Sequence, residues 1–244
     1  MTNTATAAAP AAAPRPLLAR LLGVITSPMA AFRSIVTEPK WFGALTLTTL
    51  LVAFFSALPM TTDAGRQATL DQQVSTMKSL GFEVTDQMYD GMERGAARLP
   101  YTTAASVLVI SPIIALIVAG LLFAVFNAAM GGEASFKQLY SVIAHAGVIS
   151  ALGAVFSGTI NYLRGATGSV ANLGGLLPML PEKSFAGNLL GTIDVFLVWY
   201  VVVLAIGLAV LYRRRTQPIA LALLGVYAVV ALGVAVFKSR VGGA

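Results

Sequence analysis

Residues 189–237 read LLGTIDVFLVWYVVVLAIGLAVLYRRRTQPIALALLGVYAVVALGVAVF and decide the fold. They contain two apolar runs, which are separated by the basic triplet Arg213–Arg215 and hold a single carboxylate, Asp194. An α-helix needs about 20 predominantly apolar residues to cross the roughly 30 Å hydrocarbon core of a bilayer. The stretch therefore predicts two membrane-spanning helices, at 189–212 and 217–237, with a short basic loop between them.

Three more apolar stretches of similar length precede this pair, at 41–59, 104–130 and 139–163. Across the 244 residues, 57% of the side chains are hydrophobic and only 11% are charged, whereas a soluble domain carries about 25% charged residues. One hydrophobic core cannot absorb this excess, so an integral membrane protein is the first interpretation. The disordered, collagen-like and disulfide-scaffold classes are excluded. We expect an all-α polytopic membrane protein with five transmembrane helices in one membrane domain, residues 39–237, followed by a short tail at 238–244.

The residues before the first span predict a tail and two short helices. Residues 1–14 are rich in Ala, Thr and Pro and predict a disordered tail. Within 15–38, leucines recur at helical spacing, and Ser27-Pro28 marks the start of a second helix. Both amphipathic helices are too short to cross the bilayer. They either lie in the plane of the inner membrane surface or dock on the helix bundle.

Residues 60–100, which follow the first span, change to a polar composition with six acids and four bases. Leu70 and Val74, and later Met88 and Met92, recur at helical spacing. We therefore expect two short amphipathic helices outside the bilayer, in the form of an extracytoplasmic helical hairpin.

Lys and Arg residues near the ends of the spans set the orientation of a membrane protein. With the N-terminus inside, each side carries eight of them, but three arginines fill one short inner loop while the outer cations are diluted in the acidic hairpin. This density predicts a cytoplasmic N-terminus and an extracytoplasmic C-terminus in a bacterial inner membrane. The scattered cations favour anionic lipid headgroups over nucleic acid as a partner. The cations expected at the headgroups are Arg20, Arg33, Lys40, Arg213, Arg214 and Arg215.

Asp194 is the only carboxylate within a predicted span, and a carboxylate at the bilayer centre costs at least about 2.5–3.5 kcal/mol. It follows the start of its span by five residues, which places it about 7–8 Å along the helix, near the outer headgroups. Candidate partners at this level are Arg164, Asn161, Tyr162 and Lys183. A salt bridge or hydrogen bond that holds the third span against the fourth is the structural interpretation, and proton or ion coupling is the functional one.

His145 is the only histidine and lies two turns into the third span, while Asn127 lies near the inner end of the second. A hydrogen bond between them would join the two helices and contribute about 0.6–2 kcal/mol. The alternative is a pH-sensing or proton-relay histidine, which the lack of a second titratable group in that leaflet disfavours. The small-residue pairs at 154/158 and 187/191 are typical of close helix packing, which we expect within the monomer.

The sequence offers no site for catalysis, a metal ion or a cofactor. It has no cysteine, which excludes thiolate metal ligands, Fe–S clusters and cysteine nucleophiles. An intramembrane aspartyl protease needs two carboxylates in the membrane, and neither His-Glu-x-x-His nor Gly-x-Ser-x-Gly occurs. We therefore expect a protein that is not an enzyme.

An ordered set of motifs extends over residues 17–237. The motifs are Ser27-Pro28, Phe32, Ile35, Pro39 and Trp41 before the first span, GGEASFKQ at 131–138, and Leu190, Ile193-Asp194, Phe196, Trp199 and Gly207 in the fourth span. In order and spacing, this set resembles the Yip1 family of five-span membrane proteins, in its bacterial branch. The resemblance implies a cytosolic N-terminus, five helices and no catalytic residues.

The resemblance also bears on function. Eukaryotic members of the family act in Golgi and endoplasmic-reticulum traffic and bind Rab-type GTPases, but their Asp-Leu-Tyr-Gly-Pro motif is absent here. Some bacterial members accompany ABC-type export systems as accessory subunits. The function that this implies is a non-catalytic membrane scaffold or accessory subunit with a membrane-protein partner, and a homo-oligomer stays open. The alternative is a permease that moves a small solute or protons by means of Asp194.

Overall fold

The computed structural model describes residues 16–176 and 185–241, which form helices joined by short turns. The predicted all-α class is confirmed, because these residues contain no β-strand beyond one isolated bridge. The tail predicted at 1–14 and the candidate partner Lys183 lie outside the described residues. With η marking short 3₁₀ or π-helical turns, the elements are α1 (Leu17–Thr26), α2 (Pro28–Thr37), α3 (Trp41–Ala57), η1 (Leu58–Thr61), α4 (Asp63–Ser79), α5 (Asp86–Gly95), η2 (Ala96–Arg98), α6 (Leu99–Phe123), η3 (Ala124–Ala129), α7 (Phe136–Arg164), α8 (Leu173–Leu176), α9 (Phe185–Thr192), α10 (Val195–Leu211) and α11 (Thr216–Val241).

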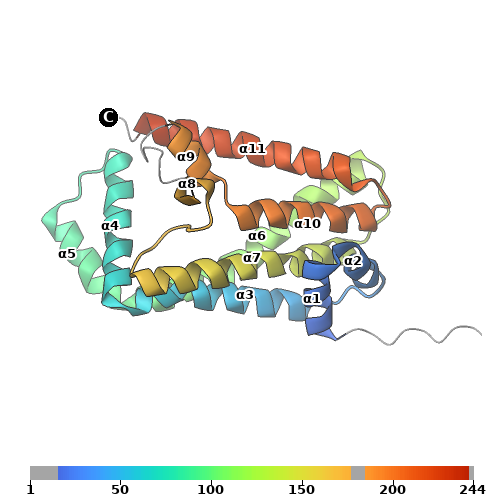
Figure 1. Ribbon diagram of the computed structural model, residues 1–244, viewed down its shortest axis with the longest axis horizontal. Coiled ribbons are helices and arrows are strands. Elements are labelled where there is room, and N and C mark those ends of the chain that lie inside the picture. Colours follow the sequence, from blue (N-terminus) through green and yellow to red (C-terminus); the bar gives the residue numbers. More distant parts are fainter. Residues whose placement is uncertain (1–15, 177–184, 242–244) are drawn as a thin grey trace, which may run out of the picture.

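Five apolar helices, α3, α6, α7, α10 and α11, extend along the long axis of the molecule (Figure 1). Helices α1 and α2 lie at one end of this bundle, together with the α6–α7 and α10–α11 connections, and we call it the N-terminal end. Helices α4 and α5 lie at the other end, near the C-terminus, and we call it the hairpin end. Consecutive apolar helices therefore run in alternating directions.

Helix α7 is the centre of the bundle. In its most apolar stretch 67% of the residues are buried, against 17% in α11 and 6% in the segment that contains α6. Helices α1, α2, α3, α6 and α10 all pack against α7. The apolar side chains of α6 and α11 mostly face outward, which suits helices that contact lipid.

Small residues let the other helices approach α7 closely. A Cβ atom at Gly158 would lie 2.2 Å from the carbonyl oxygen of Phe55, so α3 and α7 meet backbone to backbone at this point. On α10, a Cβ atom at Gly207 would lie 2.5 Å from Cγ1 of Val142 and 3.1 Å from the Phe32 ring. Helices in lipid associate through packing of this kind. The small-residue pair that ends at Gly158 therefore serves packing within the monomer.

The N-terminal helix pair is docked on the bundle. Val24 of α1 and both Phe32 and Ile35 of α2 are completely buried in the core formed with α7 and α10. On the opposite side, Leu18 and Leu22 remain exposed. The structure thus shows the docked alternative, and it leaves a second apolar face on α1 that suits the membrane interface.

Four helical segments are long and apolar enough to cross a membrane. They are Trp41–Thr61, Asp86–Ala129, Phe136–Arg164 and Thr216–Ser239. They contain the predicted first, second, third and fifth spans. The last helix continues through Lys238 to Val241, so the tail predicted to begin at residue 238 is helical at its start.

The fourth predicted span, 189–212, is not one helix. Helix α9 ends at Thr192, and α10 begins at Val195 with 17 residues of its own. The prediction of a continuous helix is therefore wrong, because the chain breaks at Ile193 and Asp194 to pair with a segment that follows α7.

The approach of α3 to α7 predicts a position where one methyl group is not tolerated. Gly158→Ala should lower the stability of the protein by about 1–3 kcal/mol, because the new Cβ would overlap the Phe55 carbonyl. Gly120→Ala is the matched control, since no atom lies within 4 Å of a Cβ at that helical position, and it should leave stability unchanged or raise it. Thermal unfolding in mild detergent measures both variants, and equal midpoints would contradict the close approach.

Candidate functional site

Asp194 caps the N-terminus of α10 instead of lying within a helix. Its Oδ1 accepts hydrogen bonds from the backbone N–H groups of Phe196 and Leu197, at 2.8 and 3.1 Å. Its Oδ2 accepts the hydroxyl of Ser169 at 2.7 Å. A carboxylate at this position is stabilised by the otherwise unpaired N–H groups and by the positive end of the helix dipole. The interruption of the predicted fourth span is thus a capped helix start.

The backbone groups at the break also find partners. Two backbone hydrogen bonds, of 2.9 and 3.0 Å, join the break to residues 171–173. The hydroxyl of Tyr227 on α11 donates to the Thr192 carbonyl at 3.0 Å and accepts the N–H of Asp194 at 3.1 Å. Unpaired backbone groups are costly in lipid, so these bonds permit the break. Tyr227 was not expected at this site, and its signal in the sequence is a lone hydroxyl in the middle of an apolar span.

Asp194 does not contact the partners expected from the sequence. Within the described chain it forms no ion pair, so it has no salt bridge to Arg164. Tyr162 is partly exposed on the end of α7. Asn161 donates from Nδ2 to the carbonyl of Gly168 at 2.6 Å. The structure therefore does not assemble the expected cluster.

The end of α7 explains why the cluster does not form. Gly165 follows the helix with φ of 59°, a left-handed conformation that ends the helix and redirects the chain. The hydrogen bond to Oδ2 of Asp194 therefore comes from Ser169 in the following segment and not from a side chain of α7. The hydrogen bond thus ties the connection after α7, rather than α7 itself, to the start of α10.

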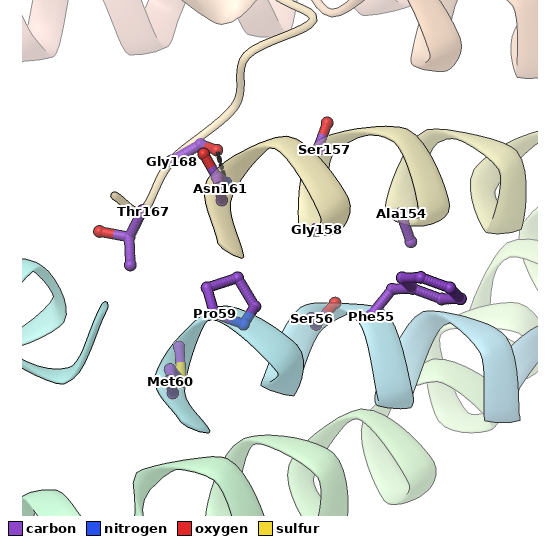
Figure 2. Close-up of a pocket in the computed structure, with 10 residues that line it drawn as sticks. All are labelled: Phe55, Ser56, Pro59, Met60, Ala154, Ser157, Gly158, Asn161, Thr167 and Gly168. Atoms are coloured by element: carbon purple, nitrogen blue, oxygen red, sulfur yellow. Dashed lines mark hydrogen bonds between the residues drawn. The ribbon is translucent and has the colours of Figure 1, made fainter. Parts of the chain in front are cut away.

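Two small cavities lie near this junction. One, of about 290 Å³, is lined in part by Asp194, Ser157 and Ser169. The other, of about 210 Å³, lies between the ends of α3 and α7, where Phe55 and Pro59 face α7 (Figure 2). Both measure less than the roughly 300–1,000 Å³ that is usual for a ligand pocket. A third cavity at the junction, lined by Asn161, Arg164 and Ser169 among others, is larger and measures about 580 Å³.

His145 and Asn127 do not meet, so the predicted hydrogen bond between them is wrong. Nδ1 of His145 lies 2.8 Å from the carbonyl oxygen of Ser141, one turn earlier on α7. Asn127 instead accepts the hydroxyl of Tyr212 at 2.7 Å and donates to the carbonyl of Ala134 at 2.7 Å. Asn127 therefore joins the end of α6 to the end of α10 and to the connection that leads into α7.

His145 and Asp194 are far apart along the bundle. His145 lies nine residues from the start of α7, toward the N-terminal end. Asp194 lies at the start of α10, which runs from the hairpin end to the N-terminal end (Figure 1). A proton relay needs neighbouring titratable groups, so the arrangement does not favour coupling between these two.

Arg20 is not a headgroup contact, contrary to the expectation. Its side chain is 4% exposed, donates to the carbonyl of Glu38 at 2.9 Å and forms an ion pair with the carboxylate of Glu38. The turn at Ser27-Pro28 folds α1 against α2 and brings these two residues together. The local pattern places Arg20 at the polar edge of a short helix, but it does not show the acid that covers it.

The other expected cations are exposed at the N-terminal end of the bundle. They are Arg33, Lys40, Arg213, Arg214 and Arg215. Arg213 is the one non-glycine residue of the described chain with a positive φ, 53°, and it turns the chain from α10 to α11. Arg214 donates to the carbonyl of Met130 at 3.1 Å and links this turn to the end of α6. This end therefore presents the basic surface expected at anionic headgroups.

The family model described as the Yip1 domain matches residues 22–237 of the chain. This protein belongs to the Yip1 family. Among curated proteins, the membrane protein YknW of Bacillus subtilis (strain 168) is 24% identical to it over 198 residues, which is 77% of this chain and 76% of YknW. No solved structure matches it. The resemblance drawn from the ordered motifs is confirmed, and the chain is a membrane protein.

The polar side chains of this Yip1 family protein join helices to one another. Among the residues that the structure describes, no three His, Cys, Asp or Glu side chains lie close enough to hold a metal ion. Both carboxylate oxygens of Asp194 are engaged by three hydrogen-bond donors. Its geometry is that of a helix cap, which positions α10.

The cap at Asp194 predicts a difference between two substitutions. Asp194→Ala should lower stability by about 1–2 kcal/mol, because it removes the acceptor for the first N–H groups of α10. Asp194→Asn should retain most of the stability, since asparagine caps helices as well as aspartate does. Thermal unfolding in detergent compares the two. An equal loss in both variants would show that the site requires the negative charge instead of the cap.

Proposed function

We propose that this Yip1 family protein is a non-catalytic scaffold or accessory subunit of a complex in the bacterial plasma membrane. It binds an extracytoplasmic protein partner through the tip of the α4–α5 hairpin. The observation that carries this proposal is a group of three exposed apolar side chains within nine residues at the tip, Leu80, Phe82 and Met88, which we call the tip patch. Exposed apolar clusters of this kind mark interaction sites.

The charge around the tip patch indicates a protein partner rather than a membrane surface. Between residues 80 and 93 the chain carries four acids and no base. Helix α5 has no buried residue, so it contributes little to the bundle itself. An anionic lipid surface repels this acidic segment. The apolar side chains of the tip patch are therefore suited to a protein groove with basic margins.

With a cytoplasmic N-terminus, the first span places the hairpin outside the cell, and five passes place the C-terminus outside as well. Helix α10 has 17 residues and is about 25 Å long at 1.5 Å per residue, close to the thickness of the hydrocarbon core. The alternating directions of the five apolar helices support this count (Figure 1). The basic surface at the N-terminal end supports a cytoplasmic N-terminus and an extracytoplasmic C-terminus.

The absence of cysteine from the sequence allows single cysteines to test this orientation. Gln87→Cys on α5 should react with a membrane-impermeant maleimide in intact cells, because the hairpin lies outside. Glu133→Cys in the α6–α7 connection should react only after permeabilisation. Both side chains are exposed, so access to the reagent depends on the side of the membrane. The reverse labelling pattern would overturn the orientation.

Photocrosslinking from the tip patch tests the scaffold function. A photoreactive amino acid at Phe82 or Met88 should yield a discrete crosslinked protein, which mass spectrometry identifies, and an export component is the first candidate. The matched control is Gln73, which is exposed on α4 outside the patch and should yield none. Phe82→Asp should also abolish co-purification of that partner in mild detergent. Crosslinks to lipid alone from both tip positions would overturn the proposal.

One observation favours a permease as a second function. The fourth predicted span is broken, and a carboxylate at the start of α10 lines a cavity, as in many secondary transporters. A neighbouring cavity of about 580 Å³ is lined by polar side chains that include Arg164, Asn188 and Lys238. Against this function, Asp194 is held as a cap and the sequence has no internal repeat. Proteoliposome flux that Asp194→Asn abolishes would favour the permease.

A further inference from the structure

An apolar groove opens between α3 and α6 on the outward side of the bundle. It measures about 580 Å³, and its walls include Trp41 and Leu50 of α3 and Leu108 and Leu116 of α6. The start of α7 contributes further side chains, among them Lys137. Because α6 is one of the least buried helices, this groove faces the medium around the bundle.

Helix α6 packs along α3 and α7, and two of its contacts lie on either side of Pro112. Toward the hairpin end, the hydroxyl of Thr103 lies 3.2 Å from the sulfur of Met60. Toward the N-terminal end, the rings of Phe123 and Phe136 are 5.7 Å apart. Pro112 lies between these contacts and lines the groove. In a membrane, a concave apolar surface of this kind is filled by an acyl chain or by another helix.

The groove has one polar end. Lys137 is exposed and forms no ion pair within the described part of the chain. Trp41 and Tyr140 meet edge to face beside it, with ring centroids 5.1 Å apart. A cation next to Trp and Tyr is the composition of the headgroup level of a membrane. The positive charge of Lys137 matches the phosphate of an anionic lipid.

The length of the groove argues for a lipid over a helix. Its wall on α3 extends from Trp41 to Leu50, which is about 13–14 Å at 1.5 Å per residue. This equals about half of the roughly 30 Å hydrocarbon core, that is, one leaflet. An acyl chain of one leaflet matches this length, whereas a transmembrane helix that followed the groove would extend about twice as far.

We propose that this groove binds one acyl chain of an anionic phospholipid, with the phosphate at Lys137 and the chain between α3 and α6. The lipid belongs to the leaflet at the N-terminal end. This site is independent of the partner proposed for the tip patch, and it holds for either orientation of the chain.

Fluorescence quenching tests the site, because the chain has two tryptophans and Trp41 lines the groove. The Trp199→Phe variant, in which Trp41 is the single tryptophan, is reconstituted in vesicles of phosphatidylethanolamine. The vesicles also contain increasing amounts of brominated phosphatidylglycerol or, in a parallel series, brominated phosphatidylethanolamine. Quenching of Trp41 fluorescence should show that the groove binds the anionic lipid with about fivefold higher affinity, because one basic residue near the surface contributes about 1 kcal/mol. Lys137→Gln should remove this preference, whereas Arg33→Gln, which removes an exposed cation outside the groove, should keep it. Equal affinities for the two lipids in the parent, or an unchanged preference in Lys137→Gln, would overturn the proposal.

Native mass spectrometry gives a second readout that does not depend on charge. The parent should retain one phospholipid per chain in mild detergent. Leu116→Trp should fill the groove and abolish retention, whereas Ile113→Trp, on an exposed part of α6 outside the groove, should retain it. Retention in Leu116→Trp would overturn the proposal. A dimer that only Leu116→Trp dissociates would also overturn it and would assign the groove to a second copy of the chain.

Discussion

The close packing of α3 and α10 on α7 is the constraint on which the rest of the structure depends. In lipid, water exclusion does not drive helices together, so close packing must hold them. Gly158 meets the backbone of Phe55, and Gly207 meets the side chains of Val142 and Phe32. Once α10 is fixed on α7, Asp194 lies beside the turn where Ser169 reaches it. Phe32 of α2 can then insert at the level of Gly207. The polar links between the helices follow from this packing.

Hydropathy could predict most of the helices, because an apolar run in lipid has hardly any alternative to the α-helix. Helix α3 begins at Trp41, where the first span was expected, and α7 contains the whole predicted third span. The roles of Asp194, Arg20 and Asn127 could not be predicted in the same way. Their partners lie 25, 18 and 85 residues away along the chain. A local pattern shows that a polar side chain needs a partner, but only the folded chain shows which one it receives.

The two ends of the molecule differ in charge, because each carries a similar number of cations whereas most of the acids lie at the hairpin end. The N-terminal end carries exposed cations on several helices and their connections, and its docked pair α1–α2 keeps an apolar outer face. The hairpin end carries the acidic segment of α5 and its exposed apolar side chains. Exposed cations beside an apolar face are suited to binding an anionic lipid surface. Acidic residues around an exposed apolar patch are suited to binding a protein. The bundle between them separates these two surfaces.

The left-handed conformation of Arg213 has a consequence for the loop between α10 and α11. A residue with a side chain pays about 1–2 kcal/mol for this conformation, which glycine adopts freely. A cation just after the C-terminus of α10 gains about 0.3–1 kcal/mol from the helix dipole and about 1 kcal/mol from anionic lipid nearby. These gains offset the backbone cost, so arginine and glycine are nearly matched here in folding energy. The two residues differ in charge, because arginine adds a positive charge to the loop and glycine does not. At this position the charge is therefore present in spite of a less favourable backbone conformation.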